Sequence, residues 1–313
     1  RRLGVSGYYV RVAPHAIFYD DQAMQRCMLI KNHREETALP ANEQVSTDAL
    51  QLVRFGLRCA DDPLVRDTVT VIDALLRVDT PSGPAWRRYN GDGYGEHEDG
   101  APFDGSGSGR PWPLLTGERG HYELLAGRDP LPYLHAMMAM ASRGGMLPEQ
   151  VWDTAAIPSR RLSPGHPSGS AMPLAWAHAE FVKLALSVHG SKPWDCPAAV
   201  WERYRGQQST PRRRVWLEQA PTARIDAGSD VLLCLREPAL VHWGVDGWHA
   251  TADTRTLPVP GLDVHVAVLP SAALHAGQRI DFTWRHQESG EWIGLDHCLK
   301  LLDEGPNTQG TSP

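Results

Sequence analysis

Apolar residues recur every three to four positions through much of the first two thirds of the chain, which predicts amphipathic helices. Leu50, Val53 and Leu57 share one face of the first helix. The next begins at Asp61-Asp62-Pro63, where a capping acid precedes a proline in the first turn. We expect about six helices packed on one another, without strand-helix alternation. The remaining helical segments are 114–125, 131–140, 170–186 and 198–204.

Two earlier segments depart from helical spacing. Residues 1–45 look irregular, apart from an expected strand at 8–12, where β-preferring residues cluster. Residues 80–111 are crowded with Gly, Pro and Asp and predict a long loop. Loops of this length are uncommon inside a compact domain and are often functional when present.

The pattern becomes β-like after residues 206–211. Short apolar or alternating runs, separated by Gly, Pro and Asp turns, predict strands at 231–235, 239–243, 264–268, 280–284 and 292–301. We therefore expect a mainly helical domain at 1–206, a small β-sandwich at 213–303 and a disordered tail at 304–313.

Composition and charge exclude several classes of function. The 313 residues carry a net charge of -6, which argues against a nucleic-acid partner because phosphate binding needs concentrated Lys and Arg. No uncharged stretch is long enough for a transmembrane helix, and the first residues do not form a signal peptide. The localisation stays undecided. The five scattered cysteines lack CxxC spacing, so buried free thiols are expected instead of disulfides or a zinc site.

Common catalytic and phosphate-binding motifs do not fit. The glycine tracts at 91–95 and 105–109 lack the spacing and the preceding strand of a nucleotide loop. The acidic run 92–99 fails the EF-hand register, which leaves open only a calcium site of another kind. Ser106 and Ser108 are expected in a flexible loop and not in a nucleophile elbow, and no HExxH pair is present. We therefore expect neither a cofactor nor a catalytic metal.

Carboxylates and aromatic residues are concentrated together in the predicted loops, at 86–96, 110–112 and 148–153. Sugars present apolar C–H faces that stack on Trp and Tyr, and hydroxyls that bind Arg, Asp and Glu. Glycoside hydrolysis also needs two carboxyl groups, one acting as an acid and the other as a base or nucleophile. The loops therefore indicate carbohydrate chemistry.

Four stretches carry a more specific signal: WRRYNGDGYGE, PFDGSGSGRPWPLLTGERGHYEL, GGMLPEQVWD and PSGSAMPLAWAHAEFVKL. Over residues 1–205 they resemble the second half of the catalytic domain of bacterial glucoamylases and glucodextranases, glycoside hydrolase family 15. The β-rich segment is similar to a module appended to some members. The resemblance implies a mainly α, (α/α)6-toroid fold, about half of it in this chain, followed by the small all-β sandwich.

The resemblance also implies an activity and its residues. Family members release glucose from non-reducing ends of α-glucans with inversion, so an α-glucan or maltooligosaccharide is the expected substrate. The family's general base falls on Glu149. Residues that hold the terminal glucose fall on Arg88, Tyr89 and Tyr94, and a stacking tryptophan falls on Trp112. The alternative for Glu149 is an acid in the first turn of a helix or in a solvated loop.

The family's general acid lies upstream of the base in a Trp-Glu-Glu segment, which this sequence lacks. The chain also lacks an initiator Met, so we expect a processed product or fragment whose partner is the missing N-terminal half of the catalytic domain. Two alternatives remain. One is a preference for α-1,6 links, as in glucodextranases. The other is a non-catalytic glucan-binding fragment.

Other side chains are expected to be structural. Glu96, Glu98 and Asp99 should form a solvated acidic loop. A second group should cap helices or pair with Arg110 and Arg119: Asp104, Glu118 and Asp153. The apolar stripe Met137, Met138 and Met140 should lie in the core. Four of the tryptophans in the β segment are expected mainly in its core, with a sugar platform as the alternative: Trp243, Trp248, Trp284 and Trp292.

Overall fold

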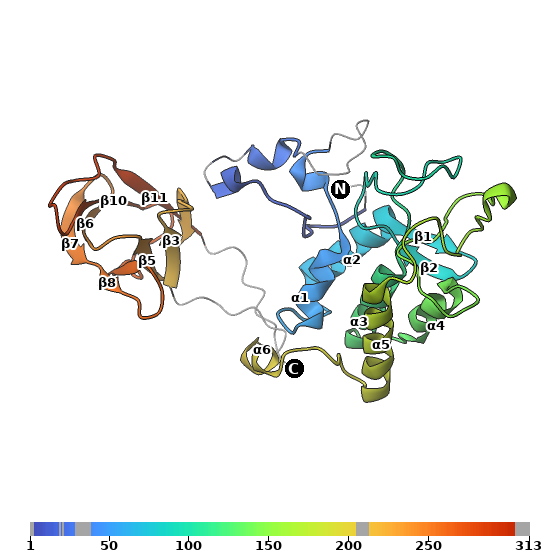
Figure 1. Cartoon of the computed structure of the whole chain (residues 1–313). Coiled ribbons are helices and arrows are strands. Elements are labelled where there is room, and N and C mark those ends of the chain that lie inside the picture. The colour runs from blue at the N-terminus through green and yellow to red at the C-terminus, as the bar shows by residue number, and fades with distance from the viewer. Residues whose placement is uncertain (1–2, 19, 21, 29–38, 205–212, 304–313) are drawn as a thin grey trace. The chain divides into compact units, whose positions relative to one another are not determined.

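The computed structural model describes residues 3–303 apart from 19, 21, 29–38 and 205–212 (Figure 1). The chain divides into two compact units, one of residues 1–14 and 24–209 and the other of residues 15–23 and 210–313. The tail expected at 304–313 lies outside the described residues. Within the described part, no helix is both long and apolar enough to cross a membrane.

The first unit is mainly helical. Its six described α-helices are α1 (Leu50–Arg54), α2 (Pro63–Leu76), α3 (Pro113–Leu125), α4 (Leu131–Met140), α5 (Ala175–Gly190) and α6 (Ala198–Tyr204). Short 3-10 turns of this unit are Ala41–Glu43, Thr47–Ala49 and Pro158–Arg160, whereas His15–Phe18 belongs to the other unit and Ala23–Gln25 lies at the boundary. Each predicted helix has a counterpart, but α1 ends before Leu57 and α5 begins at Ala175 instead of residue 170. Helix α2 begins as expected, with the Asp62 carboxylate accepting hydrogen bonds from the N–H groups of Leu64 and Val65.

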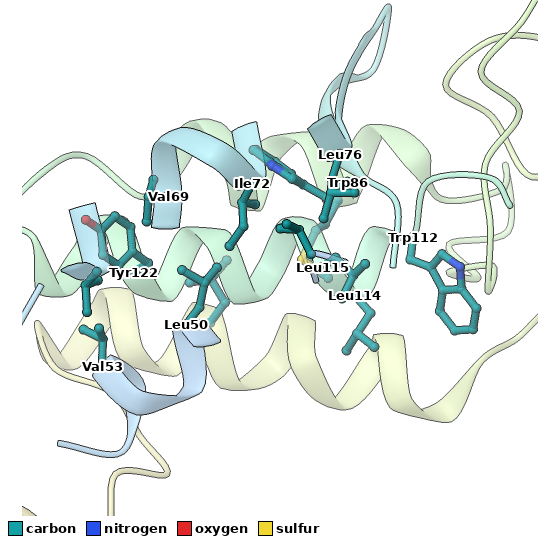
Figure 2. Packing of buried hydrophobic residues seen from close by; sticks show 14 of the residues in the cluster. Leu50, Val53, Val69, Ile72, Leu76, Trp86, Trp112, Leu114, Leu115 and Tyr122 are labelled. Atoms are coloured by element: carbon teal, nitrogen blue, oxygen red, sulfur yellow. The ribbon is translucent and has the colours of Figure 1, made fainter. Parts of the chain in front are cut away.

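Helix α3 is the centre of this unit, because it packs against α1, α4 and α5. Figure 2 shows its apolar side chains facing those of α1 and α2. Leu114 is 1% exposed and Ile72 is fully buried. The labelled members of this core are Leu50, Val53, Val69, Ile72, Leu76, Trp86, Trp112, Leu114, Leu115 and Tyr122. The first residues of α3 are therefore anchored in the core.

Three expectations for this unit are wrong. Residues 8–12 form no strand, because Tyr9 and Arg11 donate their N–H groups to the Thr68 side chain and the Gln44 carbonyl instead of to a neighbouring strand. The loop expected from residue 80 is shorter, since β1 (Arg77–Thr80) and β2 (Gly83–Trp86) form an antiparallel hairpin. Met138 is 57% exposed, because it lies on the other side of α4 from Met137 and Met140.

The second unit is β-rich. A five-stranded sheet has the order β4-β11-β10-β6-β7, and a four-stranded sheet has the order β3-β5-β9-β8. Their strands are β3 (Arg213–Leu217), β4 (Arg224–Asp226), β5 (Asp230–Leu235), β6 (Ala239–Val245), β7 (His249–Arg255), β8 (Leu257–Pro258), β9 (His265–Leu269), β10 (Arg279–His286) and β11 (His297–Leu302). The pairings β3–β5 and β4–β11 are parallel, and the others are antiparallel.

Both sheets contribute side chains to one hydrophobic cluster, including Leu233 of β5 and Phe282 of β10. Alternate residues of β5 are buried, which its continuous apolar sequence does not show. Trp243 and Trp284 lie in this core, at 7% and 5% exposure, whereas Trp292 is 52% exposed. The expectation that the strand tryptophans fill the core therefore holds for only part of the set.

All five cysteines are free thiols, as expected, but they are not buried as expected. Cys27 and Cys298 are exposed, and the other three are half-buried.

Candidate active site

The loop that follows β2 is closed at its base by its own ends. The N–H of Trp112 donates to the carbonyl of Trp86, at 2.9 Å, and the two residues form an isolated β-bridge. Trp112 then occupies the N-cap position of α3, with Pro113 in the first turn. The hairpin and the helix thereby fix both ends of the segment that carries Arg88, Tyr89 and Tyr94.

The two glycine tracts in this loop pack backbone against backbone. A Cβ on Gly107 would lie 1.9 Å from the carbonyl oxygen of Gly95, and one on Gly95 would lie 2.1 Å from that of Ser108. Such contacts admit no side chain at all. The loop expected at Ser106 and Ser108 is confirmed, but only Ser106 is exposed, and Ser108 is buried at 5% exposure. The glycines serve close backbone approach inside the loop.

Arg88 lies among the aromatic candidates. Its guanidinium carbon is 5.3 Å from the Tyr89 ring centroid, 4.9 Å from that of Tyr94 and 5.1 Å from that of Trp112. Its Nε and Nη2 donate to the two carboxylate oxygens of Asp92, at 2.8 and 2.9 Å. A bidentate pair of this kind fixes the plane of the guanidinium group. The structure therefore brings Arg88, Tyr89, Tyr94 and Trp112 together.

Asp92 is a positioning residue that the sequence analysis missed. It is 5% exposed, and besides Arg88 its carboxylate accepts from the N–H of Tyr94, at 3.0 Å. A Cβ on Gly109 would lie 2.5 Å from its carboxyl carbon. The signal for this pair in the sequence is the spacing of four residues between Arg88 and Asp92.

Glu149 belongs to a bend and starts no helix, so the helix-start alternative is wrong. Its N–H donates to the carbonyl of Ala171, at 2.8 Å. The half-buried side chain lines a pocket of about 490 Å³, here called the Glu149 pocket, together with Tyr94, Glu96 and Ser170. Burial raises the pKa of Glu149, a backbone hydrogen bond from Ala171 and the charge of Arg88 oppose that rise, and Glu96 adds to it.

Glu96 corrects the expectation of a solvated acidic loop. It is 5% exposed, and its Oε2 is buried without a hydrogen-bond partner among the described groups. Gly169 lies against it, because a Cβ there would be 2.9 Å from its Oε1. The acidic run 96–99 could not reveal this burial, since Gly169 belongs to a distant segment. Glu98 and Asp99 are exposed side chains, 66% and 71%, as expected.

Arg110 ties the two candidate loops together. It is 1% exposed, and its backbone N–H donates to the Oε1 of Gln150, at 2.9 Å. Its guanidinium group binds Asp153 through Nη1 and the carbonyls of Glu96 and His97 through Nη2. The expected Arg110–Asp153 pair is thus confirmed. Because Gln150 is the next residue after Glu149, this network also fixes the direction in which Glu149 points.

Arg88, Tyr89 and Trp112 line a second pocket of about 400 Å³, here called the Arg54 pocket. Tyr89 and Trp112 are only 4% and 5% exposed, and Trp112 is also part of the hydrophobic core. The guanidinium group of Arg11 lies 3.6 Å from the Tyr89 ring centroid. These two aromatic residues therefore combine a packing role with a place at the pocket wall.

Ion pairs connect the charged residues that line the Arg54 pocket. Arg54 donates through Nη1 to both oxygens of Glu180 and through Nε and Nη2 to Asp195. Lys183 also binds Asp195, at 3.0 Å. Arg54 and Glu180 are 4% and 3% exposed, so the charges are removed from water and depend on one another.

Glu118 faces the same pocket and does not form the expected pair with Arg110 or Arg119. Its Oε2 accepts a hydrogen bond from Thr47, and Arg119 binds Asp73 and Glu123 instead. Burial raises the pKa of Glu118 to about 8, and the nearby Glu180 carboxylate adds to the rise. At neutral pH the group is therefore mainly a protonated acid.

Asp104 caps no helix. It is paired with His97, at 3.1 Å, on the exposed side of the loop. Within the described residues, no three or more His, Cys, Asp or Glu side chains are grouped so that they could hold a metal ion. The side chains that line the two pockets include carboxyl groups, guanidinium groups and aromatic rings.

Comparison with known proteins gives the site its context. The profile of glycosyl hydrolases family 15 matches residues 19–186. A glucoamylase of Clostridium sp. (strain G0005) is 48% identical over 162 residues, which are 52% of this chain and 22% of that protein. A crystal structure of a bacterial glucoamylase complexed with acarbose is 42% identical, with a TM-score of 0.55, over 63% of this chain and 27% of that one.

The chain thus spans 22% of the length of its curated relative and 27% of the solved one. The family profile covers more than half of the chain, and the segment it covers contains both candidate loops. The two relatives, both glucoamylases, indicate the same family. This protein belongs to glycosyl hydrolase family 15.

Proposed function

We propose that this chain is part of an exo-acting glucoamylase that releases glucose from α-glucans with inversion, and that Glu149 is its general base. One observation carries the proposal: the Glu149 carboxylate is half-buried in a pocket with Tyr94, next to the ring cluster around Arg88. The family and the glucoamylase relatives support the same reaction.

Glu149 has the properties that this role requires. A general base must be ionised to accept the proton of water, and it works best when its pKa is raised toward the working pH. Burial provides that rise, while the field of Arg88 limits it. In the proposed reaction, water loses a proton to Glu149 as its oxygen attacks the anomeric carbon. The glycosidic oxygen leaves with a proton from a second carboxyl group, and glucose is released with inverted configuration.

The ring cluster is the proposed binding site for the terminal glucose. Nη1 of Arg88 takes no part in the pair with Asp92 and can donate to a sugar hydroxyl. Tyr89 and Tyr94 flank the guanidinium group, and Trp112 offers a ring for stacking. The solved bacterial glucoamylase is complexed with acarbose, which supports a glucan or oligosaccharide substrate here.

Glu96 is an unsuitable general acid even though it shares the pocket with Glu149. Its Oε2 is shielded from solvent, and its Oε1 lies against Gly169. In an inverting enzyme the general acid protonates the leaving oxygen. Its carboxyl group lies roughly 6.5–9.5 Å from that of the base, which leaves room for a water molecule between them. Because the family's general acid lies in a Trp-Glu-Glu segment that this sequence lacks, we propose that the acid comes from a part of the protein outside these 313 residues.

That other part would also complete the fold. Large apolar side chains on several helices are exposed, among them Leu75 of α2 (47%), Met138 of α4 (57%) and Val182 of α5 (53%). Exposed apolar surface of this extent is typical of a face that binds another segment. We propose that residues 1–206 form about half of an (α/α)6 toroid, and that 213–303 form an appended β-sandwich domain.

The proposal is tested in the complete catalytic domain by Glu149→Gln, with glucose release measured from maltooligosaccharides. We expect turnover to fall by roughly 10²- to 10⁴-fold, the usual range for loss of a general base. Glu202→Gln is the control, because Glu202 is an exposed acid in α6, outside both candidate loops, and it should retain activity. Near-normal glucose release by Glu149→Gln would refute the assignment. Running isomaltooligosaccharides in parallel decides between α-1,4 and α-1,6 preference.

A further inference from the structure

The residues proposed to hold the terminal glucose and the proposed base line different pockets. Arg88 and Trp112 line the Arg54 pocket, whereas Glu149 lines the Glu149 pocket. Tyr94 also lines the Glu149 pocket, and its ring centroid lies 4.9 Å from the guanidinium carbon of Arg88. The contact between Arg88 and Tyr94 therefore lies at the boundary between the two pockets.

Inversion gives the two sides of this boundary different roles. The attacking water and the leaving oxygen must lie on opposite faces of the sugar ring. The base binds the water, so the water side of the proposed site is the side of Glu149. The leaving glucan chain extends from the opposite face. Water must therefore reach Glu149 by a route that the bound glucan leaves open.

The Glu149 pocket has the size and the lining of such a route. Its volume of about 490 Å³ has room for on the order of ten water molecules, at roughly 30 Å³ each. Its lining includes the exposed residues Arg160 and Ala171, so the pocket is open to solvent. The side chains of Arg160, Ser170 and Glu149 offer donors and acceptors for water along its wall.

Phe103 forms an aromatic wall of this pocket. Its side chain is half-buried and contacts Tyr94 edge to face, with ring centroids 5.0 Å apart and an angle of 68° between the rings. Among the described residues, Phe103 lines the pocket of the base and not the pocket of Arg88 and Trp112. A change of its size should therefore alter the space beside the base and leave the glucose residues in place.

The segment that carries Phe103 is anchored on both sides of this residue. Before it, Gly100 packs so closely against Leu162 that a Cβ on Gly100 would lie 2.6 Å from the Cδ1 of Leu162. After it, Asp104 binds His97, at 3.1 Å. These contacts hold the ring in place, so the ring sets the width of the pocket beside the base.

We propose that the Glu149 pocket supplies the attacking water, and that Phe103 restricts the nucleophile at Glu149 to a molecule of the size of water. The inference rests on the proposed function. It adds to that function a route for the nucleophile and a residue that sets its selectivity. A wider pocket should admit a small alcohol as a competing nucleophile.

The test gives the complete catalytic domain α-glucosyl fluoride in water that contains methanol. The oxygen of methanol attacks the anomeric carbon, its proton passes to Glu149 and fluoride leaves, which forms methyl β-glucoside. NMR measures the ratio of methyl β-glucoside to β-glucose. We expect Phe103→Ala to raise this ratio about tenfold, the discrimination that a pocket typically makes against one additional carbon. The KM for maltooligosaccharides should stay within about twofold of the wild type.

Two further variants keep the result decisive. Phe55→Ala is the matched control, because it makes the same change in the pocket that Arg88 lines, and its product ratio should equal that of the wild type. Phe103→Leu retains an apolar side chain of intermediate size and should raise the ratio by a smaller factor. This variant provides the test if Phe103→Ala fails to fold.

The product ratio decides the outcome. A ratio that is unchanged in the folded Phe103 variants would overturn the proposal, and so would an equal rise in Phe55→Ala. The proposed function has a separate readout in the same experiment, because the wild type must release β-glucose from α-glucosyl fluoride. Release of α-glucose would refute the inverting reaction itself. Release of β-glucose with unchanged ratios would refute only the role of the pocket and of Phe103.

Discussion

The Glu149 pocket and the Arg54 pocket lie on two sides of the same ring cluster, but their carboxyl groups are balanced in different ways. In the Arg54 pocket, Glu180 and Asp195 accept hydrogen bonds from Arg54, and Asp195 also binds Lys183. In the Glu149 pocket, the guanidinium group of Arg88 is bound to Asp92, so the pKa of Glu149 is lowered only by the charge of Arg88 and a backbone hydrogen bond, and it is raised by burial and by Glu96. The comparison suggests that the paired carboxylates fix the structure, whereas the raised pKa of Glu149 suits the base that we propose it to be.

The first prediction concerns Arg54, whose removal is expected to have the largest effect on stability. Arg54→Ala would leave Glu180 and Asp195 without their main cation, and Glu180 is 3% exposed. We expect a loss of about 3–5 kcal/mol in the free energy of unfolding, the usual cost of breaking a buried pair by removing one partner. Chemical denaturation measures it.

The matched control for Arg54 is Arg77→Ala, which breaks the exposed pair with Asp79. Surface pairs contribute less than about 1 kcal/mol, so this variant should be close to the wild type. Equal losses of unfolding free energy in the two variants would contradict the view that the buried Arg54 pairs differ from an ordinary surface pair.

The second prediction concerns Glu118, whose pKa is about 8 in the folded chain. The unfolded value is near 4.5, so between these two values the unfolded chain releases a proton that the folded chain retains. This contribution to stability is fully present below about pH 4.5 and is lost as the pH rises toward 8. Glu118→Gln mimics the protonated acid and removes this loss.

We expect Glu118→Gln to be more stable than the wild type at pH 8 by roughly 1–3 kcal/mol, and equally stable near pH 4. Thermal melting across this range measures the difference. Glu202→Gln, at an exposed position in α6, is the control and should melt like the wild type throughout. A stabilisation of Glu118→Gln that does not vary with pH would contradict a protonated Glu118.

The third and smallest effect is expected from Glu96. Activity should be lost at acid pH as Glu149 becomes protonated, and the charge of Glu96 raises the pKa of Glu149. Glu96→Gln removes that charge, so it should extend activity toward lower pH, with a gain on the order of two- to fivefold at the acid end. The pH profile of kcat/KM measures it. A profile that moves to higher pH would show that Glu96 acts on Glu149 in some other way.

Local chemistry explains which parts of the fold could be predicted. The cap at Asp62 and Pro63 involves neighbouring residues only, whereas the alternate burial in β5 is not visible in its continuous apolar sequence. The hairpin β1–β2 was missed because its strands are short and lie within a segment rich in turn residues. The strand expected at 8–12 does not form because its backbone N–H groups bind the Thr68 side chain in α2 and the Gln44 carbonyl.

In the candidate site, too, contacts between distant segments could not be predicted. The matched motifs identified Glu149 and Arg88, and the structure brings the predicted ring residues around Arg88. The burial of Glu96 depends on Gly169, and the orientation of Gln150 depends on Arg110, both from other segments. Local composition could not reveal these contacts, because an acidic run is usually solvated.

The most direct test of the central claim is chemical rescue of Glu149→Ala in the complete catalytic domain. The variant is given α-glucosyl fluoride, with and without azide, and the products are analysed by NMR. If Glu149 activates water, azide can replace that water without a base. We predict a rate increase of at least about tenfold and formation of β-glucosyl azide, the inverted product. A folded variant whose rate is unchanged by azide, and which forms no glucosyl azide, would contradict the claim.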